Sequence, residues 1–304
     1  MAHDQGGDPA CWADEFSEYL GLDAPAGAAL PGPLVGADWV AAALERGDDL
    51  VLADVRWRLG AGPQRDAFEQ AHVPGAVFVD LDADLSAPAS PARGRHPLPD
   101  PEAFAAARTR LGMGDGVPVV AYDDTGGTTA ARLWWMLHVL GEPVAVLDGG
   151  MAGWTGELES GPVTPVERTA TPRTWPPDRL VTLDDVAAIA AGRSGAVLLD
   201  ARSAERYRGE VVAVDPRPGH IPSARSAPTS DNLGPDGRFL PPEVLAERYR
   251  PHATDGDVVV SCGSGVTACH DALAMVVAGL PLPRLYVGSF SQWSADEERP
   301  VATG

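Results

Sequence analysis

Lysine is absent from this chain of 304 residues, so all 23 of its basic side chains are arginines. Acidic residues outnumber them, and the formal net charge is −20 at pH 7. A chain this acidic is a poor partner for nucleic acid or for an anionic membrane surface, because both repel it. Arginines gathered in one pocket would stand out against this background and would indicate a site for a small anion.

Cysteine is also scarce, and the three that occur are Cys11, Cys262 and Cys269. Three cysteines do not make the disulfide framework that small secreted proteins use. The first nine residues hold neither a basic nor an apolar stretch, and no apolar run reaches the length of a membrane span. We therefore expect no signal peptide, no membrane segment and a location in the reducing cytoplasm.

Cofactor motifs are missing as well. The histidines and cysteines lack the spacing of zinc ligands. The glycines after Asp148 and around Gly288 match neither a P-loop nor a dinucleotide-binding fingerprint. The sequence thus predicts a protein without a metal or an organic cofactor.

What the sequence does contain is an internal repeat. Each half has an apolar run that ends in Asp-x-Arg, and each continues with a His-x-Pro motif. The matching pairs in chain order are Asp54 with Asp200, His72 with His220, residues 119–124 with 258–262, and Trp154 with Trp293. A repeat of this length indicates two copies of one domain.

Short apolar runs alternate with helical patterns in both halves, as in a parallel sheet covered by helices on both faces. The sequence predicts two such α/β domains, at residues 33–159 and 179–304, joined by a proline-rich linker at residues 160–178. Residues 1–32 are predicted to form a flexible extension. Helices are expected at residues 101–111, 128–140, 183–191, 242–250 and 267–278.

The most informative stretch surrounds Cys262, which follows a β-branched apolar run and precedes glycines at positions 263 and 265. Glycines let successive backbone N–H groups point at the sulfur, and the helix expected from residue 267 adds the positive end of its dipole. Both effects favour the thiolate, which is the nucleophilic form of cysteine. A buried structural cysteine is the alternative, and the two loop glycines favour catalysis.

No basic residue lies between Cys262 and Arg284, which argues against a cysteine phosphatase, because that chemistry needs an arginine on the phosphoryl oxygens. The run Cys-Gly-Ser-Gly-Val-Thr-Ala at residues 262–268 resembles the active loop of the 3-mercaptopyruvate sulfurtransferases, within the rhodanese superfamily. The order and spacing of the repeated motifs resemble those of tandem-domain sulfurtransferases along nearly the whole chain. The resemblance implies two rhodanese-like domains, the second of which is catalytic.

In domain 1 an aspartate, Asp123 or Asp124, stands where domain 2 has Cys262, and an aspartate cannot carry a sulfane sulfur. The resemblance therefore implies that domain 1 is inactive and forms one wall of a cleft against the active loop. It also implies that a Cys262 persulfide is held by the loop, whose substrate-binding residues would be Gly263, Gly265, Val266 and Thr267.

Arginines are candidates to bind the carboxylate of the donor, because their planar fork matches its geometry. By resemblance, Arg206 and Arg217 match the two arginines that do so, although the stretch between them departs from the family in length. Arg202 is expected to pair structurally with a carboxylate after its strand, as Arg56 would in domain 1. For any one arginine, a solvated surface position or a structural ion pair is the alternative.

Ser264 lies two residues past the nucleophile. By resemblance it would handle the thiol proton of the substrate together with His72 and Asp66. The alternative for His72 is a structural role, since its repeat partner His220 occupies the same motif. Cys269 could resolve an oxidised Cys262, or simply be a small buried residue.

The expected function is sulfur transfer from 3-mercaptopyruvate, or from thiosulfate, to cyanide or to a thiol such as thioredoxin or a small dithiol. Because no basic residue stands in the loop, 3-mercaptopyruvate is expected to be the preferred donor. The alternative is a persulfide carrier that relays sulfur between protein partners.

Overall fold

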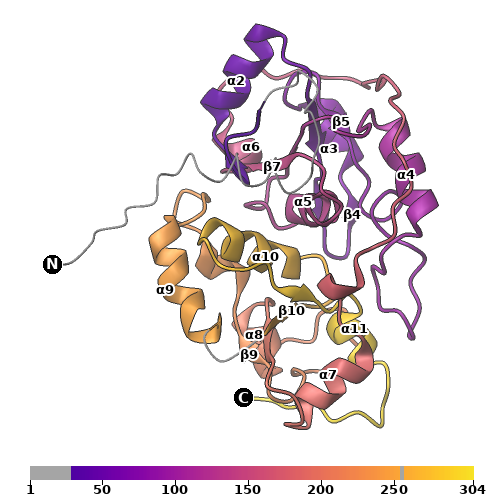
Figure 1. Cartoon of the computed structure of the whole chain (residues 1–304), viewed down its shortest axis with the longest axis vertical. Helices are drawn as coiled ribbons and strands as arrows, with labels where there is room; N and C mark the ends of the chain where they lie inside the picture. The colour runs from indigo at the N-terminus through magenta and orange to yellow at the C-terminus, as the bar shows by residue number, and fades with distance from the viewer. Residues whose placement is uncertain (1–28, 254–256) are drawn as a thin grey trace, which may run out of the picture.

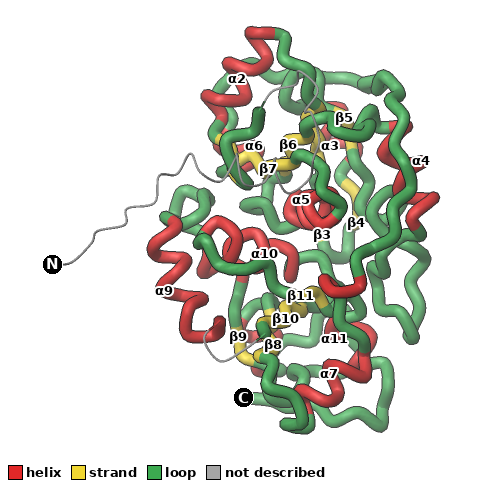
Figure 2. Tube along the Cα trace, viewed as in Figure 1, coloured by secondary structure: helices red, strands yellow, loops and turns green. Residues whose placement is uncertain are grey.

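The computed structural model describes residues 29–253 and 257–304, which form two α/β domains packed against each other (Figure 1). Nearly all of the predicted N-terminal extension, including Cys11, lies outside the described residues. Among the described residues, no helix has both the length and the hydropathy to cross a membrane. Strands form the middle of each domain, and helices and long loops surround them (Figure 2).

Domain 1 is built on a parallel sheet with the strand order β1-β7-β6-β2-β5. The strands are β1 (Leu34–Val35), β2 (Val51–Asp54), β5 (Val77–Phe78), β6 (Val119–Tyr122) and β7 (Val144–Leu147). The helices are α2 (Ala37–Arg46), α3 (Arg65–Gln70), α4 (Pro101–Arg110), α5 (Ala130–Val139) and α6 (Gly150–Gly153). A short hairpin, β3 (Trp57–Arg58) with β4 (Gly62–Pro63), projects from the sheet's carboxyl end.

The strands β2, β6 and β7 are buried along their whole length, which explains their continuous apolar sequences. Successive residues point to opposite faces. Leu52 packs into the cluster that includes Val40 of α2 and Phe68 of α3, and Ala53 packs into the one that includes Leu133 of α5. Helices therefore cover both faces of the sheet, as predicted.

Domain 2 repeats the plan with the strand order β11-β10-β8-β9. The strands are β8 (Val197–Asp200), β9 (Arg225–Ser226), β10 (Val258–Ser261) and β11 (Arg284–Leu285). The helices are α7 (Leu183–Ala190), α8 (Ala204–Arg208), α9 (Pro242–Ala253), α10 (Ala268–Val277) and α11 (Ser289–Trp293). Short 3₁₀ turns form at Pro177–Arg179 and Thr229–Asn232.

Strand register aligns the two copies residue by residue. Asp54 is opposite Tyr122 in domain 1, and Asp200 is opposite Ser261 in domain 2. The residues that follow these strands, Asp123 and Cys262, are therefore equivalent, and Asp124 is not the match.

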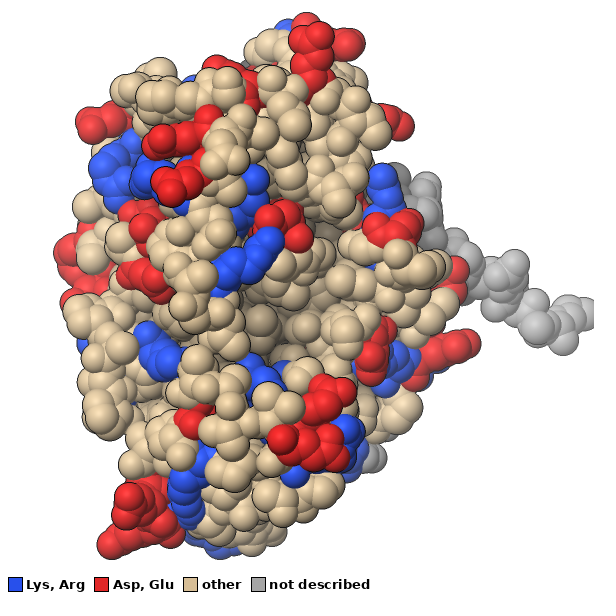
Figure 3. Space-filling view, turned by 180° about the vertical axis from the view of Figure 1, so that it is seen from behind, with Lys and Arg blue, Asp and Glu red and all other residues tan. Residues whose placement is uncertain are grey.

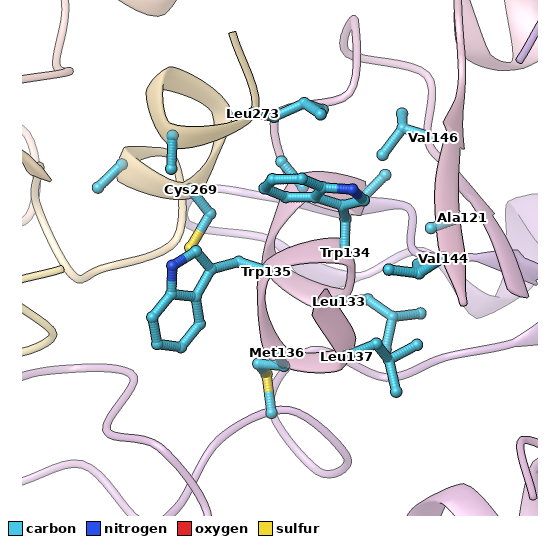
Figure 4. Close-up of a cluster of buried hydrophobic side chains, with 14 of the residues drawn as sticks. Ala121, Leu133, Trp134, Trp135, Met136, Leu137, Val144, Val146, Cys269 and Leu273 are labelled. Carbon is cyan, nitrogen blue, oxygen red and sulfur yellow. The ribbon is translucent and has the colours of Figure 1, made fainter. Parts of the chain in front are cut away.

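The two domains share one continuous core. Helices α5 and α10 pack against each other across the domain boundary. Trp134 and Trp135 of α5 are fully buried beside Cys269 and Leu273 of α10 (Figure 4). Burial of two indoles and their neighbours is worth several kcal/mol, on the order of 1.5–3 kcal/mol for each large apolar side chain. The relative position of the domains is thus fixed by packing and not by the linker alone.

Candidate active site

Cys262 lies at the carboxyl end of β10, immediately before the loop that leads into α10. Its Sγ accepts hydrogen bonds from the backbone N–H of Gly265 at 3.1 Å and of Ser264 at 3.4 Å, as the nest expected from the sequence requires. The hydroxyl of Ser289 lies 4.0 Å from the same sulfur. These donors favour negative charge on the sulfur and on a second sulfur bound to it.

The loop closes tightly only because Gly265 has no side chain. Its φ is +76°, and a Cβ there would lie 2.5 Å from the carbonyl oxygen of Val287. Any other residue would both strain the backbone and clash with the segment that follows β11. The glycine thus fixes the N–H that makes the shorter contact to Cys262.

A cavity of about 220 Å³ opens over Cys262 at the domain boundary. Its lining from domain 1 includes Trp57, Arg58, Leu59, Arg95, Thr125, Thr128 and Thr129, and from domain 2 Arg206, Cys262, Gly263, Ser264, Val266 and Thr267. Figure 3 shows a hollow across the middle of the molecule, with arginine side chains at its rim. Domain 1 therefore forms one wall of the site, and the local basic character predicted for an anion site is present.

Ser264 of domain 2 belongs to a chain of hydrogen-bonded side chains that continues into domain 1. Its Oγ lies 2.8 Å from Nδ1 of His96, and Nε2 of His96 lies 3.2 Å from Oδ1 of Asp82. Trp57 Nε1 donates to the other oxygen of Asp82 at 3.1 Å. Because the Asp82 carboxylate only accepts, the His96 proton is on Nε2, and Nδ1 accepts from the Ser264 hydroxyl.

His96 is neutral at physiological pH. Its burial, with the charge of Arg132 next and that of Arg95 adding to it, lowers its pKa to about 4 despite the opposing effect of Asp82. A neutral imidazole is a base, and its Nδ1 can take the hydroxyl proton of Ser264 while the Ser264 oxygen accepts a proton from the cavity.

The prediction that Ser264 pairs with His72 and Asp66 is wrong in this structure. His72 is buried, stacks on Phe68 and bonds its carbonyl oxygen through Nδ1 at 2.7 Å. His220 does the same in domain 2, stacking on Tyr207 and bonding its carbonyl at 2.8 Å.

The alternative considered for His72, a structural role shared by both copies, is therefore confirmed. Asp66 lies exposed in the first turn of α3, and the acid in the chain is Asp82. The loop at residues 79–100, which carries Asp82 and His96, is longer than the equivalent loop of domain 2 at residues 227–241, and that loop has no histidine. The presence of a histidine in this loop of domain 1 alone was the sequence signal that could have identified His96 as the partner of Ser264.

Arg206 lines the cavity as predicted. Its Nη2 donates to Oδ2 of Asp215 at 2.6 Å, and a Cβ on Gly263 would lie 2.9 Å from that nitrogen. Arg95 of domain 1, which sequence reasoning missed, binds the other oxygen of Asp215 and also stands over Gly263. Two guanidinium groups from two domains thus flank the residue after the nucleophile.

Arg217 was predicted to bind substrate, and the structure places it elsewhere. Its guanidinium donates to the backbone carbonyls of Ser294, Arg299 and Asp296 at 3.0, 2.9 and 2.7 Å. These contacts hold the guanidinium against the chain's last segment, and Arg217 is not among the residues that line the cavity. Arg217 is therefore a structural clamp.

Asp200 and Arg202 form the structural pair that the sequence predicts. Arg202 Nη2 donates to Asp200 at 2.6 Å and to the carbonyl of Gly219 at 2.8 Å. In domain 1, Arg56 makes the corresponding bonds to Asp54 and to the carbonyl of Ala71. Both pairs are buried.

Asp123 fills the domain 1 loop with its own carboxylate. Its Oδ1 accepts from the N–H groups of Thr125 and Gly127, and its Oδ2 accepts from Thr129 and Ala130, all between 2.7 and 2.9 Å. Asp124 instead forms a two-pronged ion pair with Arg58 at 2.6 Å. Domain 1 thus holds a carboxyl group of its own chain where domain 2 presents Cys262.

Arg132 ties the two domains together behind the active loop. From α5 it donates to the carbonyls of Gly265 at 3.0 Å and His96 at 3.1 Å. Cys269, whose Sγ lies 3.4 Å from the same Gly265 carbonyl, is fully buried, and burial raises its pKa to about 12. Cys269 is a neutral thiol, which favours the packing role over a resolving one.

Comparison with known proteins gives one family. A family model described as the rhodanese-like domain matches residues 36–157 and again residues 182–296. A protein of Pseudomonas aeruginosa named as a probable 3-mercaptopyruvate sulfurtransferase is 46% identical over 283 residues, which cover 89% of this chain and 98% of the relative. A Mycobacterium tuberculosis relative, named as a thiosulfate sulfurtransferase, is 40% identical over 89% of this chain and 97% of its own length.

A solved structure gives the same result. The 3-mercaptopyruvate sulfurtransferase SseA of Escherichia coli superposes with a TM-score of 0.72 at 35% identity, over 85% of this chain and 98% of that one. At this coverage the match includes both domains.

Proposed function

This chain belongs to the rhodanese-like family, and we propose that it transfers a sulfur atom from 3-mercaptopyruvate to an acceptor through a persulfide on Cys262. The observation that carries the choice of donor is the hydrogen bond between Ser264 and neutral His96 beside the nucleophile. A donor that carries a thiol has a proton to be moved, and this chain of groups can move it.

The first half-reaction begins with attack of the Cys262 thiolate on the sulfur of 3-mercaptopyruvate. The C–S bond breaks, its electron pair passes to the methylene carbon, and the resulting enolate is conjugated with the adjacent carbonyl. The thiol proton leaves through Ser264 and His96 and is returned to that carbon, which gives pyruvate. The enzyme keeps a Cys262 persulfide, whose charge the N–H groups of the loop stabilise.

The second half-reaction returns Cys262 to its starting state. A nucleophilic acceptor attacks the outer sulfur of the persulfide, the S–S bond breaks, and its electron pair remains on Cys262. We propose that the acceptor in a reducing cytoplasm is a thiol, such as thioredoxin or a small dithiol, and cyanide serves in an assay.

Thiosulfate is the second donor to consider, because one relative is named for it. It has no thiol proton, so it gains nothing from the Ser264 chain, and we expect its kcat/KM to be lower than that of 3-mercaptopyruvate. The active loop itself carries no basic residue, but the site does contain cations, because Arg95 and Arg206 stand beside Gly263.

The experiment separates the two half-reactions. Wild-type protein treated with 3-mercaptopyruvate is expected to gain the mass of one sulfur atom, release one equivalent of pyruvate, and lose the sulfur on addition of cyanide. The Cys262→Ser protein gains nothing, and the Cys269→Ser control behaves like wild type. Loading from a protein persulfide but not from 3-mercaptopyruvate would favour a carrier, and sulfur found on Cys269 would contradict the assignment of Cys262.

A further inference from the structure

Residues 92–96 of domain 1 lie against α11 of domain 2 and are hydrogen-bonded to it. The backbone N–H of Arg95 donates to Ser291 Oγ at 3.1 Å, and Gln292 Nε2 donates to the carbonyl of Ala92. Gly94 has φ +85°, and a Cβ there would lie 2.6 Å from the Gly288 carbonyl oxygen. The side chain of Arg95 therefore enters the site of domain 2 from a backbone that has little freedom.

The guanidinium of Arg95 is only partly used by the protein. Its Nη1 donates to Asp215. Its Nε is buried and has no hydrogen-bond partner among the described residues. Its Nη2 lies 2.7 Å from the position that a Cβ on Gly263 would take. Arg95 also lines the cavity, so this cation stands directly beside the residue that follows Cys262.

Guanidinium groups gather around Asp215. Arg95 and Arg206 bind its two oxygens, and Arg202 lies 3.6 Å away while it also pairs with Asp200. Asp215, Asp200 and Arg202 are buried, whereas Arg95 and Arg206 keep part of their surface exposed at the cavity. An anionic group bound beside Gly263 would meet these two cations at once, and their partial burial strengthens such an interaction.

We propose that Arg95 and Arg206 together bind the anionic group of the sulfur donor, with Asp215 as the positioning residue that holds both arginines over Gly263. Arg95 thereby takes the place predicted for Arg217, which is engaged with backbone carbonyls. The proposal rests on the proposed sulfur transfer and adds a specificity residue to it. It also makes the donor site a joint product of both domains.

The test varies the enzyme and the donor together. Arg95→Gln is compared with wild type on 3-mercaptopyruvate and on 1-mercaptopropan-2-one, which has the same reacting C–S bond and thiol but no carboxylate. Loss of one charge-assisted pair is expected to lower kcat/KM for 3-mercaptopyruvate by about ten- to a hundredfold. The value for 1-mercaptopropan-2-one is expected to change little, because the reacting groups remain.

The matched control is Arg93→Gln, on the same loop. Arg93 is exposed, its side chain donates to the carbonyl of Leu98 at 3.3 Å, and it is not among the residues that line the cavity. This variant is expected to match wild type on both compounds. Arg95→Lys, which keeps the charge and loses the fork, is expected to recover part of the loss.

Binding without chemistry gives a second readout. Both compounds are titrated calorimetrically into Cys262→Ser and into Cys262→Ser with Arg95→Gln. Weaker binding confined to 3-mercaptopyruvate supports the proposal, and equal weakening of both compounds, or of neither, overturns it. Failure of wild type to load sulfur from 3-mercaptopyruvate would instead count against the proposed function, so the two failures are distinguishable.

Discussion

Ser264 and His96 are 168 residues apart in the sequence, and their side chains lie 2.8 Å apart across the domain boundary. His96 is held there by Asp82 at Nε2 and by Arg132 at its backbone carbonyl. The nucleophile belongs to domain 2 and the base to domain 1. Neither domain alone contains the groups that the proposed first half-reaction needs.

Replacing His96 with Asn is expected to lower kcat/KM for 3-mercaptopyruvate by about 10²–10⁴-fold, the usual range for loss of general acid–base catalysis. Ser264→Ala is expected to lower it in the same direction. Thiosulfate turnover with cyanide as acceptor is expected to change little in both variants, since thiosulfate has no thiol proton. His72→Asn is the control, and it is expected to lower the melting temperature while leaving the ratio of the two donors unchanged.

The pH dependence of that donor ratio reports on His96 itself. Titration of Cys262 affects both donors and cancels in the ratio of their kcat/KM values. Because the pKa of His96 is lowered to about 4, the ratio is expected to stay constant from pH 7 down to about pH 5 and to fall below that. A fall centred on pH 6.5, the value of an ordinary histidine, would contradict the lowered pKa of His96.

Arg206 and Arg217 make a pair of variants with opposite expectations. Arg206→Ala is expected to lower kcat/KM for 3-mercaptopyruvate by about ten- to a hundredfold, because it removes a charged donor worth roughly 1.5–3 kcal/mol. Arg217→Ala is expected to leave kcat/KM near wild type and to lower the melting temperature, since it frees backbone carbonyls near the carboxyl terminus. Loss of activity without loss of stability in Arg217→Ala would restore its predicted role.

Asp271 gives a prediction for stability. It is fully buried on α10, Asn232 donates to its Oδ1 at 2.9 Å, and its Oδ2 has no partner among the described residues. Burial raises its pKa from 3.8 to about 7, so the folded protein keeps a proton that the unfolded chain gives up. Its contribution is complete below pH 3.8 and is lost as the pH rises through about 7.

Asn at position 271 stays neutral at every pH. The melting temperature of Asp271→Asn minus that of wild type is therefore expected to increase between pH 6 and pH 8. The exposed Asp66→Asn serves as the control, with a difference that does not vary over this window. A difference for Asp271→Asn that is flat with pH would contradict the raised pKa.

Features that depend on neighbouring residues could be predicted from the sequence. The five expected helices form with ends within three residues of the observed ones. The loop around Cys262 is local too, because Gly265 and its positive φ fix the N–H that contacts the sulfur. Arg206 was indicated by the resemblance of its own stretch of sequence to the family, and it lines the cavity.

Residues brought together by domain docking could not be predicted in this way. Arg95 and His96 lie in a loop that is longer than the equivalent loop of domain 2 and has no periodic pattern, and contacts with Ser291 and Arg132 position them. The family resemblance indicated His72, yet a motif present in both copies serves what both copies share, which is the fold. The same resemblance indicated Arg217, but backbone carbonyls of the chain's last segment, residues 294–299, hold its guanidinium elsewhere.

Asp123 has a consequence for how the two copies divide their work. Its carboxylate is a covalent part of the chain, so the loop that surrounds it is saturated at all times and its shape does not depend on turnover. The equivalent loop around Cys262 alternates between one sulfur and two during the proposed cycle. The loop of domain 1 therefore always holds the same carboxylate, whereas the loop of domain 2 gains and loses a sulfur atom in each proposed cycle. Domain 1 thus gives the cavity a wall that stays the same while the loop around Cys262 changes what it binds.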